Sequence, residues 1–382
     1  MIINKLFEEI DRLYPEYLDF LEDVAKIESP SRHKEGVDAV GKYFIDKAQK
    51  HGWKIETLHE EVAGDVVCIT MNPDAKAAPI ALSGHIDTVH PLGLFKAPIV
   101  RRDEEKMYGP GVLDCKGGVV AAFLAMDALE RCGFKERPIM LLLQTDEEVS
   151  SAISSQRTIN YICDKAKNAV AFLNLEGADG DTLVLWRKGI LRYEFTVHGI
   201  ARHSSKCFEA ANAVTEAAHK IIELEKMKDE DGLTCNCGVV HGGTVANSVA
   251  DTCVFTADIR FTTQDELEEV KKKLQEVAEH TYVSGCSCDI KEVSLRPAME
   301  KCDRNFVLLD KINEINKKAG LPTLTARMAL GGSDAAYTTL AGIPCVDSIG
   351  VSGKFHHSVN EYIVMKSLAH SAKQQAVIAL MI

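Results

Sequence analysis

Residues 138–151 read P-I-M-L-L-L-Q-T-D-E-E-V-S-S, an apolar run that ends directly in three acids. A continuous apolar run of this length is typical of a strand that is buried on both faces of a sheet. Ligands of open parallel sheets bind beyond the carboxyl ends of the strands. Asp146, Glu147 and Glu148 are therefore the first candidate functional residues.

Similar apolar runs on either side of this stretch indicate the fold class. Candidate strands lie at 78–83, 138–144, 168–175 and 343–350, and helical patterns lie at 117–130, 305–319 and the C-terminal end. Apolar strands that alternate with helices predict an α/β domain with a mostly parallel sheet covered by helices on both faces. We assign 1–188 and 298–382 to this domain.

The segment 189–297 follows a different pattern. Apolar and polar residues alternate at 191–198 and 252–261, which predicts strands with one buried face. Further strand candidates lie at 235–241 and 286–295, and helix candidates lie at 212–228 and 263–280, the second opened by a candidate capping box from Thr263 to Glu266. The order β-α-β-β-α-β predicts an inserted α+β domain of the ferredoxin-like kind.

Composition excludes several classes of partner. The chain has 44 Lys and Arg against 56 Asp and Glu, a formal charge of -12, and no basic stripe, so nucleic acid and anionic membranes are poor partners. No apolar run approaches the roughly 20 residues of a membrane span, and the N-terminus lacks the features of a signal peptide. We expect a cytoplasmic protein whose twelve cysteines are reduced.

The two C-x-C pairs, at 235–237 and 286–288, lie in strand-like stretches where alternate residues share a face. We interpret these cysteines as small core side chains. A thiolate metal site is the alternative.

Other strand ends also carry potential metal ligands. These are His85 and Asp87 in S-G-H-I-D-T-V, Asp114 in the turn G-P-G-V-L-D-C-K-G-G, Glu176 in N-L-E-G-A, and His356 and His357 in F-H-H-S-V-N-E-Y. Residues two apart in an extended segment point the same way, so Asp87 can accept a hydrogen bond from the imidazole nitrogen of His85 that does not bind a metal.

Carboxylates gathered at one sheet edge would carry too much buried negative charge unless cations neutralised it. Two divalent ions about 3.5–4 Å apart would do so, with one carboxylate bridging them. Mixed imidazole and carboxylate ligation suits zinc, with cobalt or manganese as alternatives. The glycine-rich turn at 109–118 also allows a nucleotide-binding hypothesis, but its spacing matches neither phosphate-binding fingerprint.

These motifs, in this order and over nearly the whole chain, resemble the co-catalytic zinc aminoacylase and carboxypeptidase family. That family includes glutamate carboxypeptidases, acetylornithine deacetylase, succinyl-diaminopimelate desuccinylase and tripeptidase T. The resemblance implies two Zn²⁺ ions per chain, one held by His85 and Glu176, the other by Glu148 and His357, with Asp114 bridging them. It further implies that Asp87 orients His85 and that Glu147 is the general base.

Two details of the motifs qualify this assignment. His357 is chosen over His356 because the family's ligand stands just before the x-x-N-E segment. Family members often have Pro after the acid that corresponds to Glu176, where this chain has Gly177.

The inserted domain resembles the same family in the stretches V-H-G-I-A-R-H-S-S, H-G-G-T-V-A-N-S-V and A-D-I-R-F. The resemblance implies a lid and dimerisation domain, and hence a homodimer. His203 would reach the site of the partner subunit and stabilise the oxyanion, Asn247 would support it, and Arg260 would bind a substrate carboxylate. The alternatives are a surface role for His203 and an ion pair between Arg260 and Asp258.

The resulting prediction is a metal-dependent hydrolase that cleaves a peptide or amide bond next to a free carboxylate, like a glutamate carboxypeptidase. Metal-bound hydroxide would attack the carbonyl, with Glu147 as the base. The substrate would be a small peptide or an N-acyl-amino acid, and an N-acyl-amino-acid deacylase or a tripeptide aminopeptidase are alternatives. A catalytically silent, metal-dependent binding protein is the alternative of another class, although the presence of Glu147 argues against it.

Overall fold

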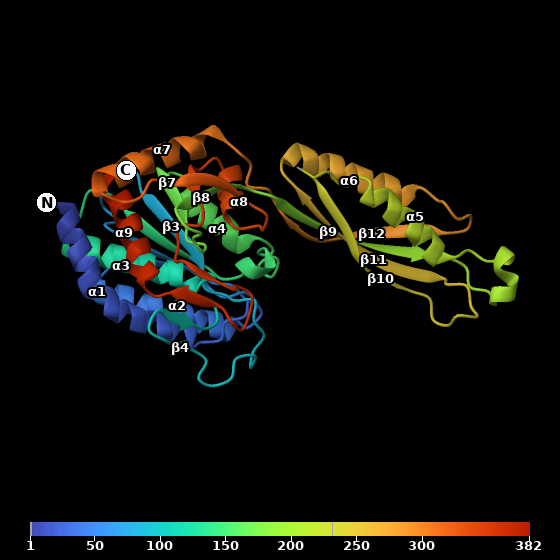
Figure 1. Cartoon of the computed structure of the whole chain (residues 1–382), viewed down its shortest axis with the longest axis horizontal. Coiled ribbons are helices and arrows are strands. Elements are labelled where there is room, and N and C mark those ends of the chain that lie inside the picture. Colours follow the sequence, from blue (N-terminus) through green and yellow to red (C-terminus); the bar gives the residue numbers. More distant parts are fainter. Residues whose placement is uncertain (1, 231) are drawn as a thin grey trace. The chain divides into compact units, whose positions relative to one another are not determined.

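The computed structural model describes residues 2–230 and 232–382, and it divides into two compact units (Figure 1). The first unit comprises Met1–Leu185, Lys301–Met328 and Tyr337–Ile382, and the second comprises Trp186–Glu300 and Ala329–Ala336. The sequence pattern predicts 298–382, and with it 329–336, as part of the first domain. The segment belongs to the second unit because N–H groups of Arg187 and Lys188 bond the carbonyls of Gly331 and Ala329, at 3.1 and 3.3 Å.

The first unit is built on a six-stranded sheet in the order β1-β2-β6-β3-β7-β14. Its strands are β1 (Lys54–Leu58), β2 (Val66–Met71), β3 (Ile80–His85), β6 (Ile139–Gln144), β7 (Ala171–Asn174) and β14 (Cys345–Val346). The pairs β6-β3, β3-β7 and β7-β14 are parallel, and the sheet is mixed only because β2 is antiparallel to both of its neighbours. The sequence analysis missed β1 and β2, whose short connection at 59–65 holds no crossover helix and so pairs them antiparallel.

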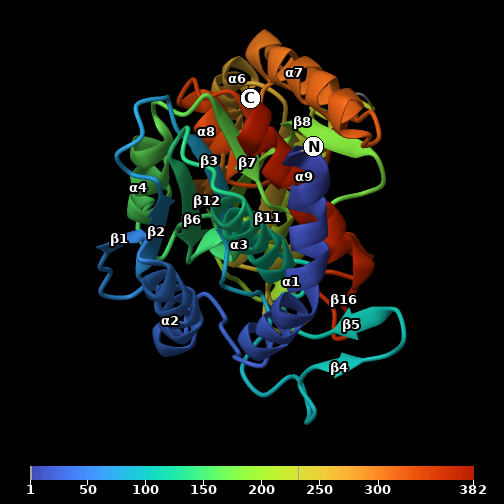
Figure 2. The ribbon, with the colours of Figure 1, turned by 90° about the vertical axis from the view of Figure 1, so that its left-hand side faces the viewer.

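Every residue of β2, β3, β6 and β7 is buried. Successive side chains of a strand point to opposite faces, so both faces of the sheet are covered. Helix α3 packs on β3 and β6 and also contacts α1 and α9, while α4 packs on β6 and α2 on β1 and β2 (Figure 2). The helices outside the second unit's core are α1 (Ile2–Ala25), α2 (Lys34–His51), α3 (Lys116–Arg131), α4 (Arg157–Ala166), α7 (Asp303–Ala319), α8 (Ala335–Leu340) and α9 (Lys366–Met381).

Buried polar contacts fasten α1 and α2 to α3. The hydroxyl of Tyr17 donates to Asp127 at 2.8 Å, while His51 Nδ1 and Trp53 Nε1 each lie 2.7 Å from a Glu130 oxygen. His51, Asp127 and Glu130 are close enough to one another to be considered as metal ligands. Because these carboxylates already accept hydrogen bonds from neighbouring side chains, we interpret the group as a packing contact.

Two smaller sheets complete the strands of this part of the chain. One has the order β15-β16-β5-β4, with β4 (Arg101–Arg102), β5 (Lys106–Tyr108), β15 (Gly353–Lys354) and β16 (Tyr362–Val364), and the other pairs β8 (Thr182–Arg187) with β13 (Thr325–Ala329). The pairing of β16 with β5 places Tyr362 opposite Tyr108. It therefore brings the segment that carries His357 beside the turn that carries Asp114.

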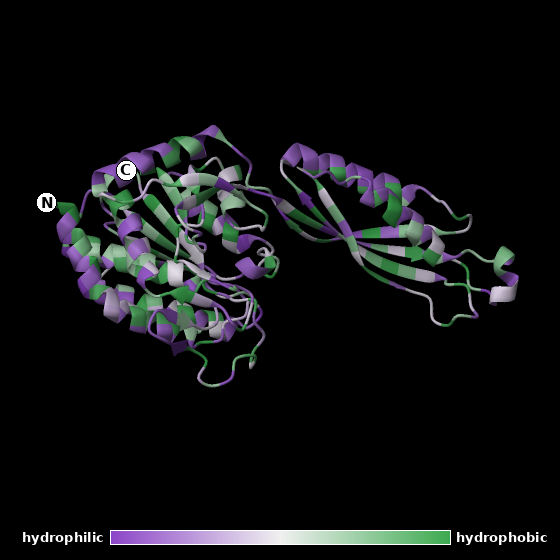
Figure 3. Cartoon of the chain, viewed as in Figure 1, coloured by the Kyte–Doolittle hydropathy of each residue, from purple (hydrophilic) through white to green (hydrophobic). Residues whose placement is uncertain are grey.

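The second unit holds an antiparallel four-stranded sheet in the order β10-β11-β9-β12. Its elements, in chain order, are β9 (Gly189–His198), α5 (Ala213–Glu225), β10 (Thr234–Gly242), β11 (Thr252–Phe261), α6 (Gln264–Glu279) and β12 (Ser287–Arg296). Buried and partly exposed residues alternate along β11. The buried residues pack with apolar side chains of α5 and α6, and the outward side of α6 is hydrophilic (Figure 3).

The start of α6 follows the predicted capping box in part. The Thr263 hydroxyl accepts the N–H of Glu266 at 3.1 Å, as in a capping box. The Glu266 carboxylate, however, accepts the N–H of Thr262 at 2.5 Å instead of that of Thr263. In the described residues, no helix has the length and apolar character that crossing a membrane requires.

Lys220 of α5 forms a buried ion pair within its own helix and also holds the end of α6. Lys220 Nζ lies 3.0 Å from a Glu216 oxygen, and both side chains are 1% exposed. The ammonium also donates to the carbonyls of Val277, Ala278 and His280 at 2.7, 3.1 and 2.7 Å. The last carbonyls of a helix have no intrahelical donor, so Lys220 supplies one for α6.

Replacing Lys220 by Met should lower the free energy of unfolding by about 3–5 kcal/mol, because Glu216 would remain buried without its cation. Chemical denaturation of the variant and the wild type would measure the change. Lys226→Met is the matched control, since Lys226 forms an exposed ion pair with Glu223 at the C-terminal end of α5. Equal stabilities for the two variants would contradict this account.

Candidate metal centre

The predicted ligands lie at the ends of different elements of the first unit. His85 ends β3, Glu176 follows β7, Asp114 lies in the turn before α3, and His357 lies between β15 and β16. Glu148 lies in the 3₁₀ turn η1 (Glu147–Val149), directly after β6. Because β3, β6 and β7 are parallel, their carboxyl ends meet at one edge of the sheet.

The side chains of these five residues form two groups that share Asp114. In the first group, His85 Nε2 lies 3.1 Å from Asp114 Oδ1 and 3.7 Å from Glu176 Oε1. In the second, His357 Nε2 lies 3.0 Å from Asp114 Oδ2 and 3.2 Å from Glu148 Oε2. Asp114 thus presents one oxygen to each group. The neighbouring His356 belongs to neither group in the described residues.

Both groups have the dimensions of a metal site. The ligand atoms of each group lie within 4.8 Å of one another. Ligands about 2.0–2.2 Å from a tetrahedral ion stand roughly 3.3–3.6 Å apart, close to the separations of 3.0–3.7 Å found here. Two imidazoles and three carboxylates fit zinc, and the shared carboxylate fits a pair of ions.

The pKa values describe how strongly these groups interact. Burial acts to raise the pKa of Asp114, but hydrogen bonds from His357 and His85 outweigh it and hold this pKa well below its ordinary value. Hydrogen bonds to Asp114 and Glu148 raise the pKa of His357 to about 10. Burial raises the pKa of Glu148 to about 7, and burial with the nearby Asp114 raises that of Glu176. The directions of these shifts follow from close contacts between the imidazoles and the carboxylates.

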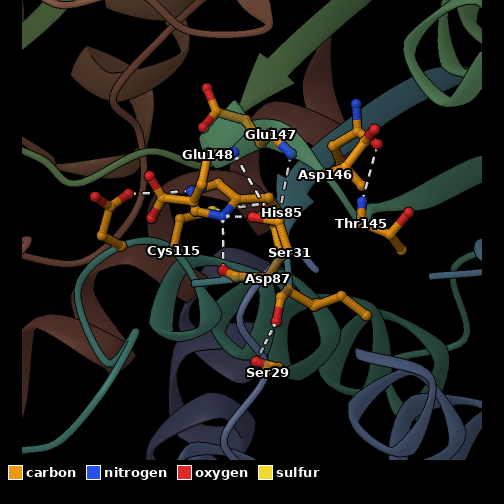
Figure 4. Close-up of polar contacts among 12 residues, drawn as sticks. Ser29, Ser31, His85, Asp87, Cys115, Thr145, Asp146, Glu147 and Glu148 are labelled. Carbon is orange, nitrogen blue, oxygen red and sulfur yellow. Dashed lines mark hydrogen bonds and ion pairs between the residues drawn. The ribbon is translucent and has the colours of Figure 1, made fainter. Parts of the chain in front are cut away.

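Asp87 connects the first group to the turn that carries Glu147 and Glu148. It is fully buried, and its two carboxylate oxygens accept the N–H groups of Glu147 and Glu148, each at 3.2 Å (Figure 4). Ser31 donates to the same carboxylate at 2.6 Å. His85 Nδ1 lies 3.0 Å from the Asp87 carbonyl and 3.4 Å from its carboxylate. Asp87 therefore faces the imidazole nitrogen that does not face Asp114, as a positioning residue would.

The three acids after β6 have different surroundings. Glu147 is 6% exposed, and its side chain leaves the turn in a different direction from that of Glu148 (Figure 4). Asp146 accepts the hydroxyl of Thr158 at 2.6 Å and the N–H of Ser154 at 3.0 Å. Asp146 thus holds the segment that leads into α4, and Glu147 lies in the same 3₁₀ turn as the ligand Glu148.

The glycines of the turn at 109–118 serve close packing. A Cβ at Gly118 would lie 2.0 Å from the Leu175 carbonyl, and one at Gly117 would lie 2.2 Å from the Val112 carbonyl. Lys116 is fully buried and donates to the carbonyls of Val24 and Ile27 at 3.2 and 2.9 Å. A lysine held in this way is not available to a phosphate, so the nucleotide-binding hypothesis loses its support.

Several residues around the centre were not singled out from the sequence. Cys115 is buried and its sulfur accepts the N–H of His85 at 3.2 Å, while Ser31 and Lys116 make the contacts described above. Glu361 is 1% exposed and accepts backbone N–H groups of the turn that carries Asp114. Acceptors of backbone N–H groups follow no fixed spacing, so no sequence pattern points to them.

The cysteines are free thiols throughout the chain. In each C-x-C pair the first cysteine, Cys235 or Cys286, is buried, and the second, Cys237 or Cys288, is partly buried. Within the described residues, the metal-ligand groups contain only histidine and carboxylate side chains.

The three predicted substrate-binding residues belong to the second unit. His203 and Asn247 lie in adjoining segments, because His203 forms a β-bridge with Ser248 and the N–H of Ser204 bonds the Asn247 carbonyl at 2.9 Å. His203 is exposed, and its Nδ1 lies 2.8 Å from the Ser205 hydroxyl. The roles of these residues toward a substrate stay a prediction.

Arg260 makes the ion pair that the sequence offered as an alternative. Its Nε lies 2.8 Å from Asp258, whose other oxygen is 2.7 Å from Arg192 Nε. Two guanidinium groups therefore share one carboxylate, and hydrogen bonds to both outweigh burial and lower the pKa of Asp258.

Comparisons with known proteins identify the family. A family model described as Peptidase family M20/M25/M40 matches residues 81–380. The chain is 27% identical over 374 residues to carboxypeptidase G2 of Pseudomonas sp. (strain RS-16), covering 96% of this chain and 89% of that one. It is 25% identical over 371 residues to a succinyl-diaminopimelate desuccinylase of Nitrosospira multiformis, covering 89% and 91%. A tripeptidase structure from Staphylococcus aureus superposes with a TM-score of 0.80 at 22% identity, covering 96% and 98%.

Asp114→Asn should reduce bound zinc from about two ions per chain to fewer than one, because a single side chain serves both groups. Elemental analysis after exhaustive dialysis would give the stoichiometry. Asp74→Asn, which changes an exposed carboxylate of the same unit, should retain the wild-type content. A variant that lacks the Asp114 carboxylate yet keeps both ions would show that the centre is misassigned.

Proposed function

The chain belongs to peptidase family M20/M25/M40, and on this premise we propose that it hydrolyses a peptide or amide bond next to a free carboxylate. The family consists of metal-dependent peptidases and amidohydrolases, and the chain is an enzyme of this class. The proposed activity is that of a glutamate carboxypeptidase, with a small peptide as substrate. We propose two zinc ions as the resident metals.

The observation that carries this proposal is the pair of ligand groups joined through Asp114, with Glu147 beside them. Glu147 directly precedes the ligand Glu148 in η1, and the Asp87 carboxylate accepts the backbone N–H of each. A protein that only bound metal would need the five ligands but no further buried carboxylate at this place. The presence of Glu147 therefore favours catalysis over metal-dependent binding.

The proposed mechanism assigns one task to each side chain. His85 and Glu176 would hold one ion, Glu148 and His357 the other, and Asp114 both. The ions, when bound, would polarise the scissile carbonyl and make a water molecule more acidic. Glu147 would accept a proton from this water as it attacks and would pass that proton to the nitrogen of the leaving amine. Asp87 would keep His85 and the Glu147 backbone in place during both transfers.

The preference for a free carboxylate rests on Arg260. Asp258 occupies the Nε side of this guanidinium, and Arg192 shares the same carboxylate, so the three groups together carry one surplus positive charge. Arg260 and Asp258 are each 28% exposed and lie on the face of β11 opposite the buried core residues. A guanidinium whose remaining N–H groups are accessible is suited to a planar carboxylate.

An N-acyl-amino-acid deacylase is the second candidate, favoured by the relative named succinyl-diaminopimelate desuccinylase. Its products also include an amino acid with a free carboxylate, so the same Arg260 would serve it. We further propose a homodimer through 189–297, in which His203, supported by Asn247, stabilises the oxyanion in the partner subunit's site. The neighbouring segments of His203 and Asn247 within the second unit are consistent with this division of roles.

Glu147→Gln should bind both metals normally and lower kcat by about 10²–10⁴-fold, since the amide cannot accept the proton. A screen of dipeptides and N-acyl-amino acids on the zinc-loaded protein would identify the substrate, and steady-state kinetics would then compare the variants. Glu61→Gln, on the exposed surface of the same unit, should keep full activity. Wild-type kcat in Glu147→Gln would remove the assignment of the base.

Arg260→Ala should raise KM about 10–100-fold for substrates with a free carboxylate, because a charge-assisted hydrogen bond of roughly 1.5–3 kcal/mol is lost. KM for the matching carboxamides should change little. Arg192→Ala is the control, since it removes the other partner of Asp258 and leaves Arg260 in place. If the two arginine variants affected acids and amides alike, Arg260 would only be an ion-pair partner of Asp258.

A further inference from the structure

Glu361 accepts hydrogen bonds from the backbone of the turn that carries Asp114. Its side chain is 1% exposed, and one oxygen, Oε1, accepts the backbone N–H groups of Leu113 and Asp114 at 2.8 and 3.0 Å. The other oxygen, Oε2, accepts the N–H of Gly111 at 3.1 Å and lies 3.4 Å from His90 Nε2. One buried carboxylate thus binds four donors, three of which belong to a single turn.

The chemistry of these four partners requires a carboxylate. An ionised carboxylate is an acceptor only, with about four lone-pair positions, so it can accept from four donors at once. A glutamine at this position would turn an NH₂ group toward at least one backbone N–H and leave that donor without a partner.

The position of Glu361 in the chain connects two ligands. It stands just before β16, in the segment that begins at His357, and its carbonyl accepts the N–H of Gly109 at 3.3 Å. Together with the pairing of β16 and β5, these contacts join the segment of His357 to the turn of Asp114. The backbone N–H of Asp114 is itself one of the donors, so Glu361 fixes the residue whose two oxygens face the two groups.

We propose that Glu361 is a positioning residue for the dinuclear centre, which sets the Asp114 carboxylate between the two metal positions. This inference rests on the proposed function. It predicts a specific defect. Without Glu361 the shared ligand Asp114 is held less firmly, so the second ion binds more weakly and its spin coupling to the first ion is reduced. A residue that only stabilised the fold would lower the melting temperature without this defect.

The chain supplies a matched carboxylate for comparison. Glu216 in the second unit is also 1% exposed and accepts two backbone N–H groups, those of Tyr282 and Val283, at 2.9 and 2.6 Å. It lies in α5 and is not among the described metal-ligand groups. Glu216→Gln therefore reproduces the loss of a buried acceptor of backbone N–H groups in the unit that does not carry the ligands.

Cobalt titration of the full chain tests the proposal, with visible absorption to count bound ions and electron paramagnetic resonance to detect spin coupling between them. In Glu361→Gln the second cobalt should bind at least about ten-fold more weakly, and spin coupling should be reduced. Glu361→Asp keeps the charge and is the more conservative change, so it replaces Glu361→Gln in the experiment if that variant does not fold. It should show the same defect to a smaller degree. Glu216→Gln should bind cobalt like the wild type.

The outcomes separate this proposal from the proposed function. If the wild type binds and couples two cobalt ions, and Glu361→Gln and Glu361→Asp do so with the same affinity and coupling, Glu361 is not a positioning residue. If Glu216→Gln weakens the second cobalt as much as Glu361→Gln does, the effect reflects general destabilisation and the proposal is wrong. A wild type that binds no pair of metal ions would instead overturn the dinuclear site itself.

Discussion

The closeness of three carboxylates and two imidazoles at one edge of a buried sheet is the constraint on which the site depends. Carboxylates at this separation repel one another unless protons or cations lie between them. Two sets of contacts offset this repulsion. Asp114 meets both imidazoles, and the surrounding carboxylates of Asp87 and Glu361 are in turn bound by backbone N–H groups. The ligands are thereby held by the backbone of several segments as well as by their own strands.

Much of the site could be predicted because it follows from strand ends. An apolar run shows where a buried strand stops, and His85, Glu148 and Glu176 come directly at or after such ends. Asp114, His356 and His357 were candidates as well, but the bridging role of Asp114 and the choice of His357 over His356 needed the resemblance to a known family. Glu361 shows the limit of this approach: its partners are backbone N–H groups 247 to 250 positions away in the chain.

The fold was predictable in its class and less so in its details. The continuous apolar runs of β3, β6 and β7 indicated a covered sheet. The strands β1 and β2 were not predicted, and β2 makes the sheet mixed because it is antiparallel to both of its neighbours. The segment Ala329–Ala336 joins the second unit through hydrogen bonds to residues more than a hundred positions earlier. Local pattern carries no information on such a contact, because the donors are side-chain and backbone groups of ordinary arginine and lysine residues.

The pairing of β9 with β12 has a consequence for how this chain could have arisen. Ile190, near the start of the inserted sheet, stands opposite Arg296 at its end, so the inserted segment begins and ends on neighbouring strands. An insertion whose two ends lie side by side is tolerated readily by the surrounding domain, because only a short gap must be spanned where the inserted segment enters and leaves. In genetic terms, 189–297 behaves as a cassette. A segment with this geometry can be inserted or exchanged without displacing the strands that carry the ligands.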